Sequence, residues 1–419
     1  MTSIDIRHGD CLEVLRSLPD NSVDSVVTDP PYGLSNTKPA QVSDVLAAWV
    51  TGDTEAVPAK KGGFMGADWD SFVPPPAVWA ECLRVLKPGG HMAVFAGART
   101  QDLMGLSIRL AGFEIRDTLG WVYGSGFPKS MDISKAVDKK LGAQREAVLV
   151  PTKKGNEKNP GGIAGEGRGG YRDISTPATS EAQRWDGWGT ALKPAIEPII
   201  LARKPLDGTV AANVLAHGVG GLNIDASRVP SNEITGWGGR GHASGGASLN
   251  LSATGSSDGQ PNPSQGRFPA NVLLDEHAAK EMDKQSGVLK SGAHKAGQPR
   301  NAQSKSSFTL NDTTTYSDSG SEGGASRFFP VFKYQAKAPK KERPVIVRED
   351  GTKVQHPTVK PVALMEWLVT LITPEGGTTL DPFAGTGTTL QAARDKGFAA
   401  IGIEQDADYI ALIEQRLSA

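Results

Sequence analysis

Residues 379–404 read TLDPFAGTGTTLQAARDKGFAAIGIE, and this segment is the most informative about the fold. It predicts a strand, a glycine turn, a short helix closed by Gly397 and a second strand that ends at Glu404. Such a unit suits a ribose-bearing cofactor, because glycines allow close backbone approach and the terminal acid can bind hydroxyls. It is not a Walker A loop, since no Lys-Ser or Lys-Thr follows the glycines. Leu390 also replaces the third glycine of the dinucleotide fingerprint.

A second motif, Asp29-Pro30-Pro31-Tyr32, follows the apolar residues 23–28, which predict a strand. The carboxyl end of such a strand faces the ligand crevice of an open α/β sheet. The exocyclic amine of adenine or cytosine is a poor nucleophile, because its lone pair is delocalised into the ring. The Asp29 carboxylate and the Pro30 carbonyl would hold the two amine hydrogens and localise that lone pair, while Tyr32 stacks on the base. Alone, the four residues also fit an ordinary strand-ending turn.

Together, these segments resemble the β class of DNA amino-methyltransferases that use S-adenosylmethionine, in which Asp-Pro-Pro-Tyr precedes the glycine loop. Residues 8–12 (HGDCL) and 356–361 (HPTVKP) are further matches. The resemblance covers roughly the first 130 and the last 80 residues. Residues 124–130 (GSGFPKS) and 192–199 (LKPAIEPI) look like segments of phage and prophage methylases.

The resemblance implies a doubly wound, Rossmann-like α/β sheet with a large, loop-rich insertion. Asp29, Pro30, Pro31 and Tyr32 would be catalytic. The cofactor would be S-adenosyl-L-methionine, with its methionine part at Asp381 and Gly385, its ribose hydroxyls on Glu404 and its adenine amine on Asp10. For Lys360, the alternative to a contact with the cofactor is an ordinary surface lysine that precedes a helix. The full set of residues implied to bind the cofactor is Asp10, Thr358, Lys360, Asp381, Phe383, Gly385, Gly387 and Glu404.

The implied reaction is direct methyl transfer to the N6 amine of adenine in double-stranded DNA, with the target base rotated out of the stack. Adenine is favoured because relatives that methylate the cytosine amine usually have Ser in place of Asp29. That rule has exceptions, so cytosine N4 stays open. A NAD-dependent oxidoreductase would explain the glycine loop and Glu404 but leaves residues 29–32 unexplained. A DNA-binding module that has lost catalysis is disfavoured by the intact motifs.

Composition and charge limit the partners and the chemistry that the chain can support. The 419 residues carry a net charge of −1, so DNA affinity requires a local basic patch. Residues 327–348 hold seven Lys or Arg against one Glu, with aromatic residues between them, and either contact phosphates or form a partly buried strand. Neither Cys11 nor Cys82 lies in a metal-binding spacing, so no metal is expected. Neither follows a proline, which disfavours methylation of cytosine carbon.

The chain has no apolar stretch of membrane-spanning length and no secretory signal, which predicts a cytoplasmic protein of a bacterial or phage-infected cell without a membrane partner. A homodimer, a restriction nuclease partner and the recognition sequence stay open. The expected organisation is a catalytic half at 1–130, a target-recognition insertion at 131–350 and a cofactor-binding half at 351–419.

Alternating strands and helices are expected over 1–30 and 77–117, with Cys82 in the core of a helix that ends at Gly89-Gly90. A buried strand at 196–201 and a helix at 361–373 follow the same logic. Residues 33–73 predict a loop that needs no helix, and 151–190 and 231–326 predict mobile loops. The polar insertion also contains four candidates for contact with a DNA groove, namely Trp185, Trp188, Trp237 and Arg240. The tryptophans are expected to fill a small core instead.

Overall fold

The computed structural model describes residues 3–35, 37–58, 68–124, 126, 130–151, 171–230, 266–290, 322–332, 344–348, 350–356 and 358–418. The chain divides into two compact units. Unit 1 contains Met1–Gly124 and Ile196–Ala419, and unit 2 contains Ser125–Ala195. Among the residues that the structure describes, none of the helices combines the length and the apolar character of a membrane span.

Unit 1 is built on a sheet to which the described residues contribute nine strands, in the order β1-β15-β14-β2-β3-β7-β4-β8-β11. Strands β1, β15, β14, β2 and β3 are parallel to one another. Strand β7 is antiparallel to both neighbours, β3 and β4, while β8 and β11 run parallel to β4. In sheet order the bounds are Ile4–His8, Ala399–Glu404, Thr378–Asp381, Val23–Thr28, Leu86–Phe95, Ile196–Arg203, Glu114–Val122, Val272–Asp275 and Val331–Phe332.

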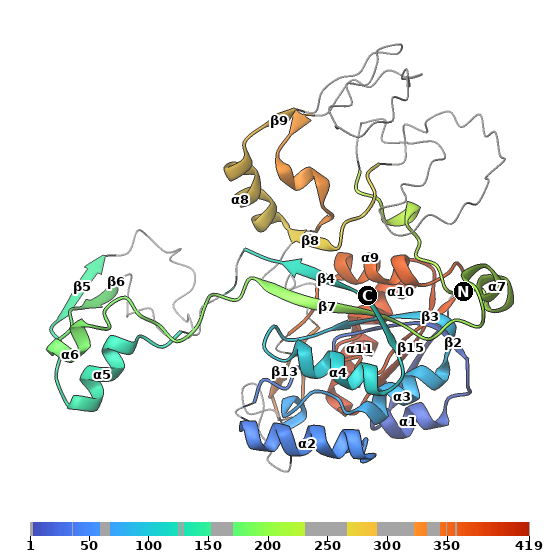
Figure 1. Ribbon diagram of the computed structural model, residues 1–419, viewed down its shortest axis with the longest axis horizontal. Helices are drawn as coiled ribbons and strands as arrows, with labels where there is room; N and C mark the ends of the chain where they lie inside the picture. The colour runs from blue at the N-terminus through green and yellow to red at the C-terminus, as the bar shows by residue number, and fades with distance from the viewer. Residues whose placement is uncertain are drawn as a thin grey trace, which may run out of the picture. The chain divides into compact units, whose positions relative to one another are not determined.

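Helices cover both faces of this sheet (Figure 1). Val26 of β2 packs into the layer on one face and Val27 into the layer on the other, and Met92 and Ala93 of β3 divide in the same way. Since side chains alternate along a strand, apolar residues at successive positions need cover on both sides. The predicted doubly wound α/β sheet is therefore confirmed. The first layer contains α1, α3 and α4 (Cys11–Ser17, Pro76–Val85, Gln101–Leu110), and the second α9, α10 and α11 (Val362–Ile372, Thr388–Asp395, Ala407–Ser418).

Smaller elements complete unit 1. Helix α7 (Val210–His217) follows β7 and packs near β3, and α8 (Glu276–Ser286) follows β8. Two short antiparallel pairs, β9 with β10 and β12 with β13, span Leu289–Lys290, Glu322–Gly323, Ile346–Val347 and Lys353–Val354. Four-residue and three-residue 3-10 turns lie at Ala325–Phe328, Asp225–Ser227 and Asp68–Asp70.

Two local expectations were wrong. Helix α2 (Pro39–Thr51) occupies the middle of the stretch 33–73, where no helix was expected. Val45 and Trp49 are four residues apart and lie buried on one face, so tertiary burial stabilises this helix. Helix α3 ends at Val85, before the expected end at Gly89-Gly90. These two glycines already belong to β3, in the part of the strand where its pairing with β2 shifts register. Cys82 is fully buried, as predicted.

The division into units differs from the expected insertion at 131–350. Strand β7 lies between β3 and β4 in the middle of the main sheet, and β8 and β11 extend that sheet. Only Ser125–Ala195 forms a separate unit. The reason is apolar content, since Ile199, Ile200 and Leu201 of β7 are buried on both faces of the sheet, as only an interior strand allows. Most of 231–326 lies outside the described residues.

Unit 2 contains α5 (Ile133–Leu141), α6 (Ser180–Gln183) and the antiparallel strands β5 (Ala147–Pro151) and β6 (Tyr171–Ser175). The buried Asp138 carboxylate accepts hydrogen bonds from Arg145, Thr179 and the Ala178 amide, which ties α5 to the start of α6.

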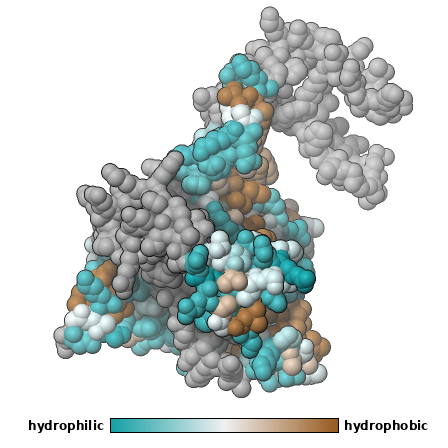
Figure 2. Space-filling model, turned by 90° about the vertical axis from the view of Figure 1, so that its left-hand side faces the viewer, coloured by the Kyte–Doolittle hydropathy of each residue, from teal (hydrophilic) through white to brown (hydrophobic). Residues whose placement is uncertain are grey.

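Two tryptophans of unit 2 do not fill its core. Trp185 is 43% exposed and Trp188 is 59% exposed, and their rings meet edge to face with centroids 5.3 Å apart. The prediction that they are core residues was wrong, because the buried centre of the unit is the Asp138 network. Figure 2 shows hydrophobic and hydrophilic residues interspersed on this side of the molecule. Trp237 and Arg240 lie outside the described residues.

Candidate active site

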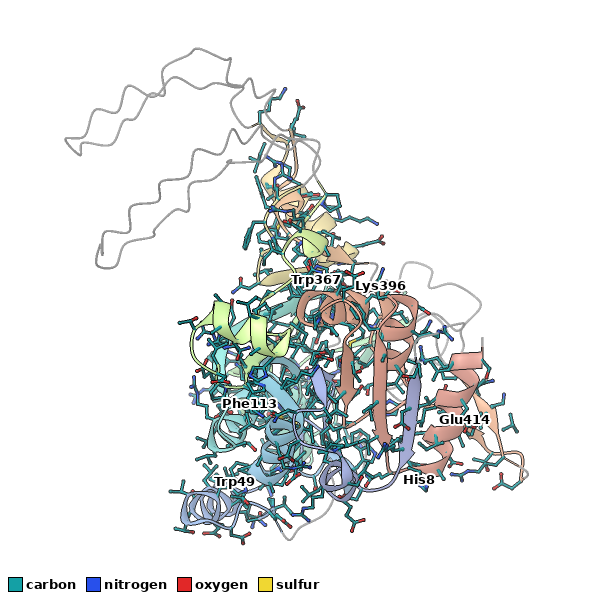
Figure 3. All side chains as sticks on the ribbon, turned by 90° about the vertical axis from the view of Figure 1, so that its right-hand side faces the viewer. His8, Trp49, Phe113, Trp367, Lys396 and Glu414 are labelled. Carbon is teal, nitrogen blue, oxygen red and sulfur yellow. The ribbon has the colours of Figure 1, made fainter. Side chains whose placement is uncertain are left out.

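The carboxyl ends of the parallel strands meet at one edge of the sheet. Thr28 ends β2, Asp381 ends β14 and Glu404 ends β15, where it pairs in register with His8 of β1. Figure 3 shows His8 at this edge, far from Lys396, which follows α10 at the opposite end. Because β7 runs antiparallel, its first residues arrive at the same edge. This edge is the ligand-binding position in open α/β sheets.

Four side chains meet just beyond β2. The Lys360 ammonium lies 2.8 Å from Asp29 Oδ2 and 3.1 Å from Glu197 Oε2, and donates to the Tyr32 hydroxyl at 3.0 Å. The Tyr32 hydroxyl donates to Asp29 Oδ1 at 2.8 Å and lies 3.4 Å from Glu197 Oε2. Two carboxylates therefore share one cation and one hydroxyl. We call Asp29, Tyr32, Glu197 and Lys360 the carboxylate cluster.

Burial and charge shape the titration of this cluster. Burial opposes the charge of Lys360, but the ion pairs with Asp29 and Glu197 outweigh it and raise its pKa above the ordinary value. Burial, reinforced by the same two carboxylates, raises the pKa of the Tyr32 phenol well above its usual range. Lys360 is thus cationic and Tyr32 is a neutral hydrogen-bond donor at neutral pH. The cluster carries a net negative charge, which suits a cationic ligand.

The turn that carries Asp29 is held from three sides. Asp70 accepts hydrogen bonds from the backbone amides of Tyr32 at 2.7 Å and Gly33 at 2.9 Å. Thr100 donates to the Tyr32 carbonyl at 2.6 Å. Gly33 has a φ of 67°, and a Cβ at this position would lie 2.8 Å from the backbone nitrogen of Val73. Only glycine therefore fits there. Added to the two prolines, these contacts fix the carboxylate before any substrate arrives.

The glycine loop between β14 and α10 presents its backbone to the same edge. Gly385 and Gly387 have φ of 53° and 74°, a conformation that other residues rarely adopt. The Gly385 amide donates to Glu404 Oε2 at 2.8 Å, and the Asp406 amide donates to Oε1 at 2.9 Å. Burial raises the pKa of Glu404. Its carboxylate is therefore oriented by two backbone amides and keeps lone pairs for hydroxyl groups of a ligand.

Asp381 links the glycine loop to the catalytic turn. Its Oδ1 accepts from the Thr28 hydroxyl at 2.7 Å and from the Phe383 amide at 3.1 Å, and burial raises its pKa to about 6. Phe383 in turn packs against Trp79 of the core, with ring centroids 6.3 Å apart. Both residues therefore have structural contacts, and their predicted contacts with the cofactor stay predictions.

An imidazole ring stands over the glycine loop. A Cβ built on Gly385 would lie 3.6 Å from His356 Nε2. The His356 ring stacks on the Trp69 ring, with ring centroids 6.1 Å apart. It meets the Tyr409 ring edge-on, with ring centroids 4.8 Å apart. Burial lowers the pKa of His356, so the ring is neutral at pH 7. Its Nδ1 lies 2.5 Å from the Thr358 carbonyl oxygen, which fixes the segment that carries Thr358 and Lys360.

Sequence reasoning assigned no role to several residues that lie at this edge. Glu197 lay inside the quoted stretch 192–199, and a carboxylate entering an apolar strand was the signal for it. Tyr409 had no such signal. Asp10, expected at the cofactor adenine, caps α1 by accepting from the Leu12 and Glu13 amides, and its cofactor role stays a prediction. Within the described ranges, no group of His, Cys, Asp and Glu could hold a metal ion.

The residues at this edge fit a cofactor with a ribose and a positive charge. Glu404 is aligned for hydroxyl groups, the Gly385 turn leaves open backbone beside the His356 ring, and the carboxylate cluster is net negative. A nicotinamide cofactor would use the first two features but would leave the carboxylate cluster without a function.

Comparisons with known proteins show which family the chain resembles. A family model described as DNA methylase, N6_N4_Mtase, matches residues 23–415. The chain is 24% identical over 420 residues to the type II methyltransferase M.HindIII of Haemophilus influenzae, which covers 96% of this chain and 91% of the relative. It is 42% identical over 65 residues to the type II methyltransferase M2.DpnII of Streptococcus pneumoniae, which covers 16% of this chain and 24% of that relative. The solved structure of PvuII DNA methyltransferase (cytosine-N4-specific) aligns with 99% of this chain and 87% of that chain, at 14% identity and a TM-score of 0.44.

Because the family model spans most of its length, this chain belongs to the N6_N4_Mtase family of DNA methylases. It is a transferase that acts on DNA, and S-adenosyl-L-methionine is its cofactor. The predicted class of enzyme is thereby confirmed. The family includes transfer to either amine, N6 of adenine or N4 of cytosine.

Proposed function

We propose that this enzyme methylates the exocyclic N6 amine of adenine at a specific site in double-stranded DNA. The proposal rests on the carboxylate cluster, in which Asp29 is held next to the aromatic ring of Tyr32 at the ligand-binding edge of the sheet. Asp29 supports adenine over cytosine, since relatives that methylate the cytosine amine usually have Ser there. The full-length similarity to a type II methyltransferase supports a sequence-specific substrate.

The chemistry of the cofactor is the supply of an electrophilic methyl group on a sulfonium. The protein would hold it with Glu404 on the ribose hydroxyls, the Gly385–Gly387 turn along the methionine part, and Asp10, Thr358, Lys360, Asp381 and Phe383 around it. A target base rotated out of the duplex would stack on Tyr32. Most of the rate would then come from alignment of the amine with the methyl group.

Asp29 has three tasks in this scheme. Its carboxylate accepts a hydrogen bond from the target amine, and the Pro30 carbonyl accepts the other, so that the nitrogen lone pair points at the methyl group. As the new N–C bond forms, the nitrogen becomes positively charged, and a fixed carboxylate beside it lowers the barrier. The methylated amine then releases one proton, for which Asp29 is the adjacent acceptor.

Sequencing of modified bases in DNA from cells that express the enzyme tests this proposal. The expected result is N6-methyladenine at one short recognition sequence, absent from cells that express Asp29→Ala. N4-methylcytosine at the recognised site would overturn the adenine assignment. Unmodified DNA from cells that contain the folded enzyme would overturn the function.

A further inference from the structure

Both oxygens of Asp29 are engaged in the structure. Tyr32 donates to Oδ1 at 2.8 Å, and the Lys360 ammonium lies 2.8 Å from Oδ2. In the proposed reaction the target amine needs one of these oxygens as its own acceptor. The Lys360 side chain is only 11% exposed. If its ammonium moved away from Asp29 and had no other anion beside it, it would be a buried, unpaired charge.

Glu197 already contacts the two groups that occupy Asp29. Its Oε2 lies 3.1 Å from the Lys360 ammonium and 3.4 Å from the Tyr32 hydroxyl. It reaches them because β7 runs antiparallel to β3, which brings the start of β7 to the carboxyl edge of the sheet. A small movement of Lys360 and Tyr32 therefore exchanges one carboxylate for the other without leaving either donor unpaired.

We propose that Glu197 is a positioning residue, which takes over the Lys360 ammonium and the Tyr32 hydroxyl when the target amine binds Asp29. The inference rests on the proposed role of Asp29. It also explains the charge of the cluster, since two carboxylates around one ammonium leave one negative charge for an amine that becomes positive.

The test combines two substitutions in single-turnover methyl transfer with saturating DNA and cofactor, so that binding does not limit the rate. Glu197→Gln keeps the size of the side chain but removes its charge, and leaves Lys360 with Asp29 as its anionic partner in the cluster. The expected rate falls by roughly tenfold or more, while the affinity for S-adenosylhomocysteine stays near that of the unmodified enzyme. Glu197→Asp, which keeps the charge, should keep a larger part of the rate.

The decisive variant is Glu197→Gln combined with Lys360→Met. Removal of the ammonium frees Asp29 again, so the double variant should transfer methyl groups faster than Glu197→Gln alone. If Glu197 only stabilises the fold, the rate losses caused by Glu197→Gln alone and by Lys360→Met alone multiply in the double variant instead. A multiplicative loss, a normal rate for Glu197→Gln, or equal losses for Glu197→Gln and Glu197→Asp would each overturn the proposal.

A matched control lies at the other end of the same strand. Glu114 pairs with Arg203, the last residue of β7, at 2.6 Å. Glu114→Gln removes a carboxylate partner of β7 far from the cluster and should leave the transfer rate unchanged. Failure of the proposed role of Asp29 is seen separately, because Asp29→Ala would then retain activity in the same assay whatever Glu197 does. Failure of the proposed function itself would leave the DNA unmethylated by the unmodified enzyme.

Discussion

At the residue scale, the Asp29 carboxylate is useful because other groups fix it. Asp29→Ala removes an acceptor that matters most as positive charge develops on the attacking amine. Single-turnover methyl transfer should therefore fall by roughly 10²-fold or more. The fold should persist, since Lys360 keeps Glu197 as a partner. Affinity for S-adenosylhomocysteine should barely change in calorimetric titration. Near-normal transfer by the folded variant would place the active site elsewhere.

Asp381 offers a pH-dependent test of the link between the two motifs. Burial raises its pKa to about 6 in the folded state, whereas an unfolded aspartate titrates near 4. Between these values the folded state binds more protons than the unfolded state. The resulting stability is therefore complete below about pH 4 and is lost as pH rises through about 6.

The measurement compares the unmodified enzyme with Asp381→Asn in denaturant titrations from pH 4 to 7.5. The free energy of unfolding of the unmodified enzyme should fall relative to Asp381→Asn by about 2 to 3 kcal/mol over this range. Asp53→Asn, at an exposed position, serves as the control substitution. A constant difference between Asp381→Asn and the unmodified enzyme would show that the buried carboxyl does not titrate there.

At the element scale, α2 depends on tertiary packing. Trp49 is buried, donates from its indole nitrogen to the Ala56 carbonyl at 2.8 Å and meets Phe72 edge to face at 5.9 Å. Phe72 lies next to the turn at Gly33. The helix therefore supports the wall behind the catalytic turn.

Trp49→Ala should lower the free energy of unfolding by about 3 to 5 kcal/mol, as for other buried aromatic residues. Val50→Ala in the same helix is the control, since Val50 is 71% exposed and its loss should cost less than about 0.5 kcal/mol. Chemical denaturation measures both. Equal effects of the two substitutions would mean that α2 does not pack as described.

At the scale of the whole molecule, a net charge of −1 requires that DNA binding come from local basic groups. The basic segment at 327–348 includes Lys340 and Lys341, which lie outside the described residues. If they contact phosphates, neutralising both should weaken binding to all DNA sequences alike. The slope of log affinity against log salt should flatten by about 0.9 for each lost contact. Loss of site preference at an unchanged slope would instead assign the segment to base recognition.

The local features of this protein could be predicted from its amino-acid sequence. The apolar residues of β2 and β3, the glycine turn at 385–387 and the Asp29–Tyr32 motif each have a signature within a few neighbours, because strand and helix periods and turn conformations are set locally. Their order along the chain also indicated the class of enzyme before any contact was known.

The set of side chains that meet at the site could not be predicted in this way, because it depends on contacts between distant parts of the chain. The Tyr32 hydroxyl is separated by 165 residues from Glu197 and by 328 residues from Lys360. Glu197 reaches this site because β7 enters the middle of the sheet in the antiparallel direction. The same placement puts β7 in unit 1 and leaves Ser125–Ala195 as the separate unit. Strand order is set by packing between distant segments, for which no local pattern of residues carries a signal.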